Sequence, residues 1–493
     1  MPEASSAADR GFFGHPRGLS TLFFTEMWER FGYYGMRSLL ILFMTAPAAA
    51  GGLGMGVPKA AAVYGIYTSM VYMASLPGGW IADRFLGQQR AILAGGIVMS
   101  AGYLMLAVPG PAPFYGGLCL VVLGTGLLKP NISTIVGQLY EAADRRRDAG
   151  FSIFYMGINL GAFLAPLACG FVGERLDYRW GLALAGAGMV VGVLTFVAGR
   201  PRLGDAGSRP APKTALEHSR ARRQFRIGIG AVALLGAVGM AAQALGWISW
   251  TAESLVNVVG LLLFAIVAVL FGWLFLAGDW TPLERKRLLA ILVLFLISCL
   301  FWSVFEQAGS TLNLFAKENT DRGLIGFEIP ASWLQSMNSF FIWSLAPVFA
   351  WLWIRLGNRE PSSPAKFLWG MVLAGAGFLV LVPPAITTEA GGRAGFGWLI
   401  ATYLLHTMGE LCLSPVGLSA VTKLAPARVA GMMMGVWFVS IAMGNYLGGR
   451  VASFYGALPL PLLFGVIGGG AVAAGLVLTV FARPIVRLMS GVK

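Results

Sequence analysis

The chain has 493 residues, of which 57% are hydrophobic and only 12% are Asp, Glu, Lys or Arg. Soluble globular proteins carry roughly 25% charged residues, so this composition excludes a soluble enzyme, a secreted domain and a nucleic-acid-binding protein. A transmembrane helix needs about 20 mostly apolar residues, and the roughly 281 apolar side chains could supply about fourteen such helices. The formal charge of +14 then reflects the Lys and Arg that polytopic membrane proteins collect in cytoplasmic loops.

Fourteen apolar runs follow one another along the chain. The first six lie near residues 20–46, 58–82, 91–108, 113–139, 149–173 and 180–199. A polar stretch over 200–226 precedes two further runs near 227–247 and 254–277. The last six runs lie near 288–316, 332–356, 366–384, 396–422, 429–455 and 458–482. We therefore predict an all-α polytopic membrane protein with an N-terminal six-helix bundle (1–199), a basic linker with two extra transmembrane helices (200–287) and a C-terminal six-helix bundle with a tail (288–493).

The distribution of Lys and Arg along the chain predicts its orientation. With the N-terminus inside, the inner loops and tails hold about 26 of the 36 Lys and Arg, and the outer loops hold about seven. Both termini are therefore predicted to be cytoplasmic. Six spans on either side of a linker indicate two similar bundles, and such parallel repeats are typical of one large transporter architecture.

A small set of charged residues interrupts the apolar spans. Each such charge costs at least about 2.5–3.5 kcal/mol at the centre of a helix, and it persists only where it is paired or faces water. The set comprises the acids Glu26, Glu29, Glu306 and Glu410 and the bases Arg30, Arg37 and Lys129. Four acids against three bases leave one carboxylate without a cation. Because burial raises the pKa of a carboxylate and a nearby cation lowers it, an acid that exchanges its cationic partner during a cycle would carry a proton.

The first span concentrates these charges on one side of a helix. Glu26 and Arg30 are four residues apart, and Arg30, Tyr33, Tyr34 and Arg37 follow at helical spacing. This spacing predicts a polar stripe of acids, bases and phenols. The alternative interpretation of the stripe is a set of structural ion pairs near the cytoplasmic end of the span.

Five motifs resemble those of the proton-dependent oligopeptide transporter family of the major facilitator superfamily, and the resemblance extends over the whole chain. The first-span string Glu26-Met-Trp-Glu29-Arg30-Phe-Gly-Tyr33-Tyr34-Gly35 is similar to the family's E-x-x-E-R-F-x-Y-Y-G motif. The other four strings are Gly126-Leu-Leu-Lys129-Pro130-Asn131, Phe154-Tyr155-Met-Gly-Ile-Asn159-Leu-Gly161, Phe301-Trp302-Ser-Val-Phe-Glu306-Gln307 and Gly409-Glu410-Leu-Cys-Leu-Ser414-Pro415. The resemblance implies the major facilitator fold and proton-driven symport of di- and tripeptides by alternating access.

The resemblance also implies roles for the intramembrane charges. Glu26, Glu29, Arg30 and Glu306 would couple transport to the proton. Arg37 would pair with Glu306, and Lys129 with Glu410, as gate salt bridges across the two bundles. A dipeptide presents one carboxylate and one ammonium group, so the cations Arg37 and Lys129 and the anion Glu410 could recognise its two ends.

The resemblance further implies a set of residues that line the peptide cavity. Besides Arg37, Lys129 and Glu410, this set contains Tyr33, Tyr34, Tyr72, Asn159, Trp302, Asn338, Ser414 and Trp437. Two positions depart from the family pattern: Ser339 stands where the family has a proline, and Gly65 stands where animal members carry a histidine. We therefore expect proton handling to rest on the carboxylates.

The sequence leaves alternatives to peptide transport open. The same fold could carry nitrate, drugs or other organic anions, and a channel or a non-transporting sensor is a different class. An enzyme is the least favoured reading, because the sequence has no paired nucleophile and base and no metal-binding cluster. We expect no cofactor apart from the coupling proton, no metal and no nucleic-acid partner. Peptides, protons and the lipid bilayer are the expected partners, and the chain is expected to act as a monomer in the bacterial inner (plasma) membrane.

Overall fold

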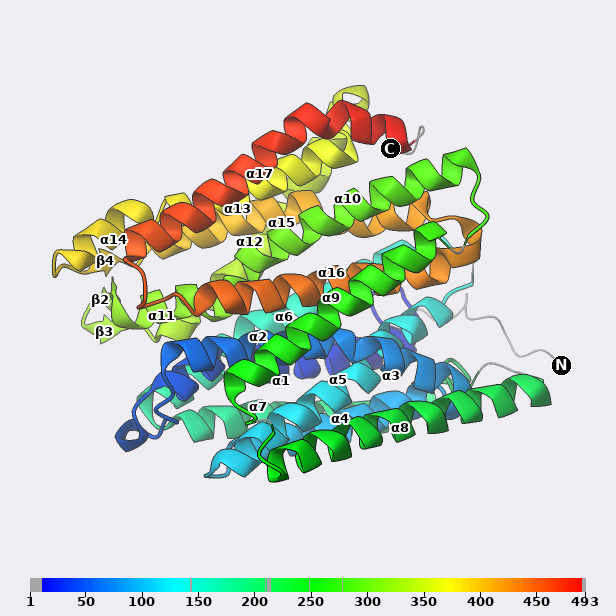
Figure 1. Cartoon of the computed structure of the whole chain (residues 1–493), viewed down its shortest axis with the longest axis horizontal. Coiled ribbons are helices and arrows are strands. Elements are labelled where there is room, and N and C mark those ends of the chain that lie inside the picture. The colour runs from blue at the N-terminus through cyan, green and yellow to red at the C-terminus, as the bar shows by residue number, and fades with distance from the viewer. Residues whose placement is uncertain are drawn as a thin grey trace.

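The computed structural model describes residues 11–141, 144–208, 210, 214–247, 249–276 and 278–489, and these residues form an elongated helical bundle (Figure 1). The helices of the first half are α1 (Arg17–Thr45), α2 (Val57–Met73), α3 (Ser75–Ile81), α4 (Gln88–Leu106), α5 (Pro111–Gln138), α6 (Arg147–Arg175) and α7 (Tyr178–Gly199). The linker contributes α8 (Ala215–Ala244) and α9 (Ala252–Leu276). The second half contains α10 (Pro282–Phe305), α11 (Thr311–Glu318), α12 (Ser336–Leu356), α13 (Ser363–Leu379), α14 (Val382–Glu389), α15 (Gly397–Leu424), α16 (Ala430–Ala452) and α17 (Leu460–Met489).

Short elements connect the helices. They include two 3₁₀ turns of the second half, η5 (Glu306–Gly309) and η6 (Ala331–Gln335). Strands β1 (Thr320–Asp321) and β4 (Ala394–Gly395) pair in parallel, whereas β2 (Gly323–Leu324) and β3 (Phe327–Glu328) form an antiparallel hairpin. This hairpin marks one end of the bundle, which we call the hairpin end. The opposite end, where α1 begins and α17 ends, is called the terminal end (Figure 1).

The fourteen predicted spans are all helical, and eleven of the described helices are long and apolar enough to cross a membrane. Helix α1 is not among the eleven because Glu26, Glu29, Arg30 and Arg37 lie within it. The predicted major facilitator architecture of two six-helix bundles with two linker helices is therefore confirmed. Three predicted spans, however, are each divided into two helices: α2 and α3, α10 and α11, and α13 and α14.

Prolines follow two of the predicted site residues inside their helices. Pro130 comes directly after Lys129 in α5, and Pro415 comes directly after Ser414 in α15. A proline within a helix removes one backbone hydrogen bond and crowds the carbonyl four residues before it. In each case the missing backbone hydrogen bond therefore lies next to a polar side chain of the site.

The two halves approach most closely where α2 crosses α16. A methyl group added to Gly65 of α2 would lie 2.8 Å from the Cα atom of Gly449, so the two backbones are almost in direct contact. Nearby, the Ser69 hydroxyl donates to the carbonyl of Ala442 at 2.8 Å. Small residues permit such backbone contact between helices in a bilayer. Position 65 therefore has no room for a side chain here.

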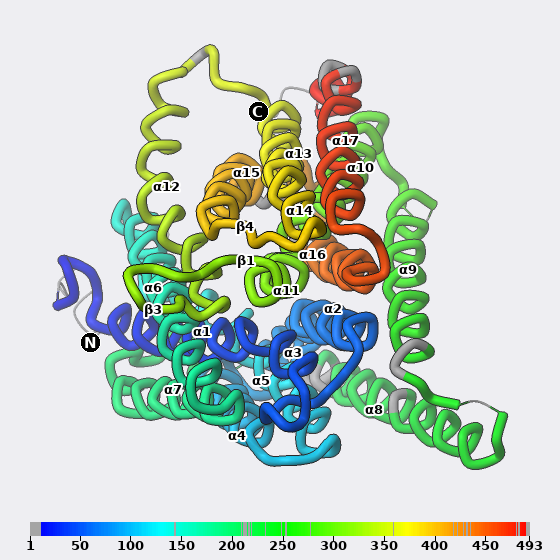
Figure 2. The backbone as a smooth tube through the Cα atoms, turned by 90° about the vertical axis from the view of Figure 1, so that its left-hand side faces the viewer, coloured from blue at the N-terminus to red at the C-terminus, as the bar shows by residue number. Residues whose placement is uncertain are grey.

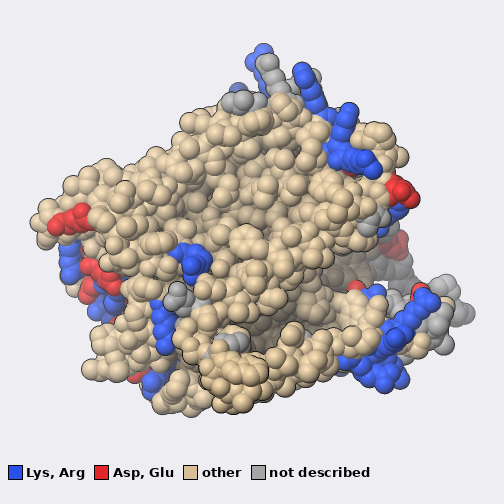
Figure 3. All heavy atoms as spheres, viewed as in Figure 1, with Lys and Arg blue, Asp and Glu red and all other residues tan. Residues whose placement is uncertain are grey.

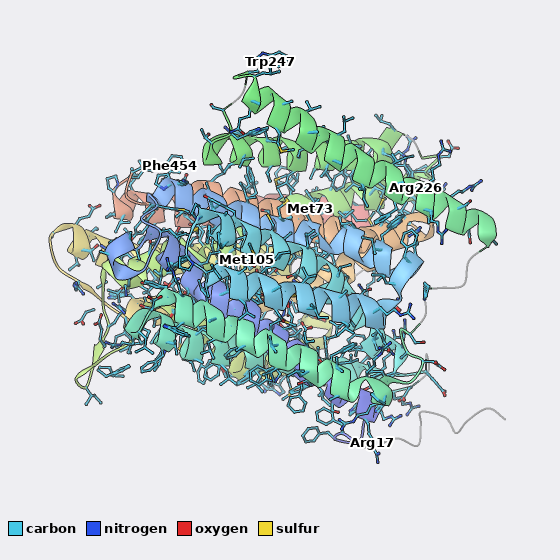
Figure 4. All side chains as sticks on the ribbon, turned by 90° about the horizontal axis from the view of Figure 1, so that it is seen from below. Arg17, Met73, Met105, Arg226, Trp247 and Phe454 are labelled. Carbon is cyan, nitrogen blue, oxygen red and sulfur yellow. The ribbon has the colours of Figure 1, made fainter. Side chains whose placement is uncertain are left out.

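The linker helices lie beside the bundle (Figure 2). Helix α8 begins at Ala215, twelve residues before the predicted span, because a capping box formed by Thr214 and Glu217 starts it within the basic stretch. Only 6% of its apolar stretch is buried. Figure 4 shows α8 along the edge of the molecule, with Arg226 within the helix and Trp247 just beyond its end. The apolar side chains of α8 can therefore contact mainly lipid.

Candidate functional site

A buried ion pair joins the two halves near the hairpin end. Arg37 of α1 places Nη2 2.5 Å from Oε2 of Glu306 in η5, and both side chains are 8% exposed. The interruption between α10 and α11 puts Glu306 in this position, because the chain forms a 3₁₀ turn there instead of a continuous helix. The Arg37 Nε atom also donates to the hydroxyl of Tyr64 at 2.8 Å. The predicted pairing of Arg37 with Glu306 is therefore present, and Tyr64 is a partner that the motifs did not indicate.

A second charged group lies within α1 itself. The Arg30 guanidinium is 3.2 Å from the Glu26 carboxylate and also contacts that of Glu29, and all three side chains are buried. The Arg30 guanidinium lies 5.3 Å from the centre of the Tyr33 ring. One oxygen of each carboxylate has no hydrogen-bond partner among the described residues. Two carboxylates share one cation, so this group can hold one proton without leaving a cation unpaired.

The predicted ion pair between Lys129 and Glu410 is not formed in this conformation, a difference from the expectation. Among the ion pairs of the described residues, neither side chain takes part. Instead, Lys129 Nζ lies 4.1 Å from the centre of the Tyr72 ring. Glu410 accepts a hydrogen bond of 3.0 Å from Asn338 Nδ2, which is also 3.0 Å from the Thr407 hydroxyl. Each charge therefore has a polar or aromatic neighbour within its own half.

A small cavity of about 30 Å³ lies between the halves, beside the Arg37–Glu306 pair. Three of the predicted residues line it together: Tyr34, Arg37 and Asn338. The wall also contains Ala162, Pro166, Phe305, Ala308, Gln335, Ser339, Tyr403 and His406. Sequence reasoning missed Gln335, Tyr403 and Thr407, because a single polar residue in an apolar span resembles an ordinary hydrogen-bonded core residue. Ser339, which replaces a proline of the family pattern, leaves α12 helical through Asn338.

The predicted site residues fall into two groups by exposure. Six are partly exposed although they come from helices on both sides of the interface: Tyr34, Tyr72, Lys129, Asn338, Glu410 and Ser414. The other nine are buried: Glu26, Glu29, Arg30, Tyr33, Arg37, Asn159, Trp302, Glu306 and Trp437. The unpaired charges Lys129 and Glu410 are thus partly exposed, whereas the charges that form ion pairs are buried.

Three of the buried residues are in places that the cavity prediction did not anticipate. Asn159 donates to the carbonyl of Tyr155 at 3.0 Å within α6. Trp302 is buried against α16, with its backbone-proximal atoms next to Gly444. The Trp437 ring packs against Gly417 of α15. In this conformation the two tryptophans belong to the core of the second half, and their contact with a peptide stays a prediction.

The chemistry of the site is that of charges and hydrogen bonds. No group of three or more His, Cys, Asp and Glu residues that could hold a metal ion occurs in the described part of the chain. What the described residues offer is a polar interior with two separated opposite charges, Lys129 and Glu410, and a sealed ion pair at one end. Such an arrangement can bind a solute that carries both charges and can close behind it.

Comparisons with known proteins agree with this description. Residues 89–461 match the sequence pattern of the POT family (PTR2). The chain is 42% identical over 496 residues to the peptide transporter YePEPT of Yersinia enterocolitica, covering 98% of this chain and 96% of that protein. It is 36% identical over 496 residues to the di-/tripeptide transporter of Lactococcus lactis subsp. cremoris, covering 98% and 99%. A crystal structure of the peptide transporter POT in complex with sulfate superimposes with a TM-score of 0.92 at 44% identity, covering 99% of both chains.

Proposed function

Because the chain belongs to the POT family of transporters, we propose that it imports di- and tripeptides together with protons by alternating access. The observation that carries this proposal is the contrast between the sealed Arg37–Glu306 pair and the unpaired Lys129 and Glu410 in the polar interior. The proton is the coupling ion, no other cofactor is needed, and one chain contains the complete path.

Opposite charges in the interior suit the two ends of a peptide. The carboxylate of a peptide would bind Lys129, with Arg37 as a second cation, and the ammonium group would bind Glu410. Charge-assisted hydrogen bonds of this kind are roughly twice as strong as neutral ones. Asn338 holds the Glu410 carboxylate in place at 3.0 Å, so the acceptor is oriented before the ligand arrives. Recognition of the two ends leaves the peptide's side chains free to vary.

Proton coupling would depend on the carboxylates that form ion pairs in this conformation, which are Glu306, Glu26 and Glu29. A proton on Glu306 removes the charge that holds Arg37, so the two halves can separate at the hairpin end. Removing one charge of a buried ion pair leaves the other uncompensated, which is strongly unfavourable. Protonation of Glu306 and separation of the two halves would therefore depend on each other. The Glu26–Arg30–Glu29 group can take up one proton for the same reason, since it has two carboxylates and one cation.

The orientation of the chain follows from the positive side chains. Lys and Arg gather at the terminal end of the molecule (Figure 3), where α8 begins with the exposed residues Arg220, Arg222, Arg223 and Arg226. Cytoplasmic loops of membrane proteins are enriched in Lys and Arg. The terminal end, where α1 begins and α17 ends, is therefore proposed to face the cytoplasm, and the hairpin end to face outward. The described conformation is then closed on the outside.

Uptake of labelled dialanine into proteoliposomes tests the proposal. We expect faster uptake with an acid-outside gradient, accumulation above the equilibrium level, and loss of that accumulation when a protonophore is added. Uptake that is unaffected by the protonophore would contradict proton coupling.

Competition experiments separate peptides from other solutes of the same fold. A carrier of nitrate or another simple anion has no use for a carboxylate such as Glu410, which would repel its substrate. Unlabelled dipeptides should therefore compete with labelled dialanine, whereas nitrate at the same concentration should not. Competition by nitrate alone would favour the anion carrier.

A further inference from the structure

A buried carboxylate at the hairpin end connects the halves, and it lies outside the family motifs. Glu174, next to the last residue of α6, has a side chain that is only 2% exposed. One of its oxygens is 3.0 Å from Lys317 Nζ of α11 and accepts the backbone N–H of Ala331 at 3.1 Å. The other accepts both the backbone N–H and the hydroxyl of Ser332, at 2.9 and 2.7 Å. We call Glu174, Lys317, Ala331 and Ser332 the Glu174 cluster.

Further contacts hold the loop around this cluster, some within the loop and some to α6. Arg322, which lies 4.0 Å from Glu174, forms an ion pair of 2.6 Å with Glu328 in β3. Arg175 lies 5.0 Å from the centre of the Phe327 ring and donates to the carbonyl of Glu328. The hairpin and η6 thereby pack on the end of α6, although they belong to opposite halves of the chain.

The contacts continue along α6 below the cluster. The indole of Trp333 donates to the carbonyl of Leu167 at 2.9 Å, and the Ser336 hydroxyl donates to that of Phe163 at 2.8 Å. One face of α6 therefore receives donors from η6 and α12 over about three turns. All of these donors belong to the second half, and all of the acceptors belong to the first.

We propose that the Glu174 cluster is a second outer gate, which helps to keep the transporter closed to the outside. The inference rests on the proposed function, because it requires the two halves to separate at the hairpin end during transport. Separation would break all the bonds of Glu174 to α11 and η6 together. A buried carboxylate that loses its partners is strongly disfavoured unless water reaches it, so no stable half-open intermediate is expected at this point. Glu174 then acts as a positioning residue that sets the population of the closed state, and it does not contact the substrate.

Thiol labelling without peptide tests this gate. Ser38 of α1 is fully buried, and its carbonyl accepts a hydrogen bond from Asn313 of α11, so it lies in the same interface. A Ser38→Cys reporter in right-side-out vesicles should react slowly with a membrane-impermeant maleimide added outside. Glu174→Ala should raise the labelling rate roughly tenfold, because it shifts the protein toward the open state. Lys317→Met, which retains the bonds to η6, should give a smaller increase.

The controls distinguish this gate from a general effect of charge or folding. Glu328→Gln removes a carboxylate that pairs with Arg322 within the loop of the second half, and it should leave the rate unchanged. Protein without the Ser38→Cys change supplies the background from Cys119, which is exposed. Because Lys317 is 35% exposed, its variant is expected to fold even if Glu174→Ala does not. Unchanged labelling in both variants, or equal acceleration by Glu328→Gln, would overturn the gate. Since no peptide is present, neither result depends on whether dialanine is the substrate.

Discussion

The two ends of the interface between the halves are built on different principles. At the hairpin end, polar contacts cross from one half to the other: Arg37 pairs with Glu306, and Glu174 binds Lys317. Toward the terminal end, the charges of the interior stay within their own halves, with Lys129 over Tyr72 and Glu410 beside Asn338. Charged side chains thus join the two halves at the hairpin end, whereas Lys129 and Glu410, toward the terminal end, do not join them. Among the described residues, the ion pairs that join the two halves lie at the hairpin end.

The largest effect is expected from Glu306→Gln, which removes the anion of the crossing pair. Breaking a buried ion pair from one side costs about 3–5 kcal/mol, which corresponds to a change of at least roughly a hundredfold in an equilibrium. We expect proteoliposomes to lose gradient-driven accumulation of labelled dialanine but to retain counterflow exchange. Asp321→Asn, an exposed carboxylate of the same end, is the control and should transport normally. Normal accumulation by Glu306→Gln would remove this pair from the coupling mechanism.

A somewhat smaller effect is expected at the unpaired charges. Glu410→Gln should weaken competition by dialanine roughly ten- to a hundredfold, because a hydrogen bond to a charged group contributes about 1.5–3 kcal/mol. N-acetylated dialanine lacks the ammonium group, so it should compete equally weakly with the wild type and with the variant. If the variant lowers competition by both compounds to the same extent, Glu410 does not recognise the amino end.

A substitution at Gly65 tests whether the close backbone contact between α2 and α16 contributes to stability. Gly65→Ala would place a methyl group 2.8 Å from the Cα atom of Gly449, so the backbones must move apart. Overpacking typically costs about 1–3 kcal/mol, and we expect the melting temperature in detergent to fall by about 2–6 °C. Gly465→Ala is a matched control, since the added methyl group would meet nothing within 4 Å. Equal melting temperatures for the two variants would show that the crossing tolerates separation.

The smallest effect is expected on the melting temperature, from a substitution at the terminal end. There the His15 ring is hydrogen-bonded to the hydroxyl of Tyr140 at 2.9 Å, and both residues belong to the first half. Burial, and then the positive charge of Arg146, lower the pKa of His15, while Asp144 partly offsets this. The folded state therefore binds fewer protons than the unfolded state, and its stability decreases as the pH falls below about 6.5. We expect His15→Gln to remove a small part of the decrease in melting temperature between pH 7.5 and pH 5.5. An identical pH profile for variant and wild type would show that His15 does not titrate in this range.

Much of the fold could be predicted from the sequence because a bilayer imposes simple rules. Apolar length located all fourteen helical segments, the deep charges marked Arg37 and Glu306 as site candidates, and the family resemblance implied that these two residues pair. Periodicity did not reveal the interruption that places Glu306 in a 3₁₀ turn, because the run over 288–316 is apolar on both sides of it. It also did not reveal the early start of α8, which depends on local capping by Thr214.

The parts of the site that sequence reasoning missed share one property. Glu174 lies near the end of a helix, where a carboxylate is ordinarily solvated, and only the loop of the opposite half buries it. Tyr64 bonds Arg37 across two helices of the first half. Both depend on contacts between segments distant in sequence. Likewise, the sequence identified Lys129 and Glu410 as opposite charges, but it could not determine that this conformation keeps them apart.

The contact between Gly65 and Gly449 has a consequence for the entropy of the transport cycle. Freezing a long side chain at an interface costs up to about 2 kcal/mol in lost rotamer freedom, whereas glycine has no rotamers to lose. At the contact between Gly65 and Gly449 itself, the interface of α2 and α16 forms without ordering any side chain. This contact therefore adds no loss of side-chain entropy to the closing of the interface.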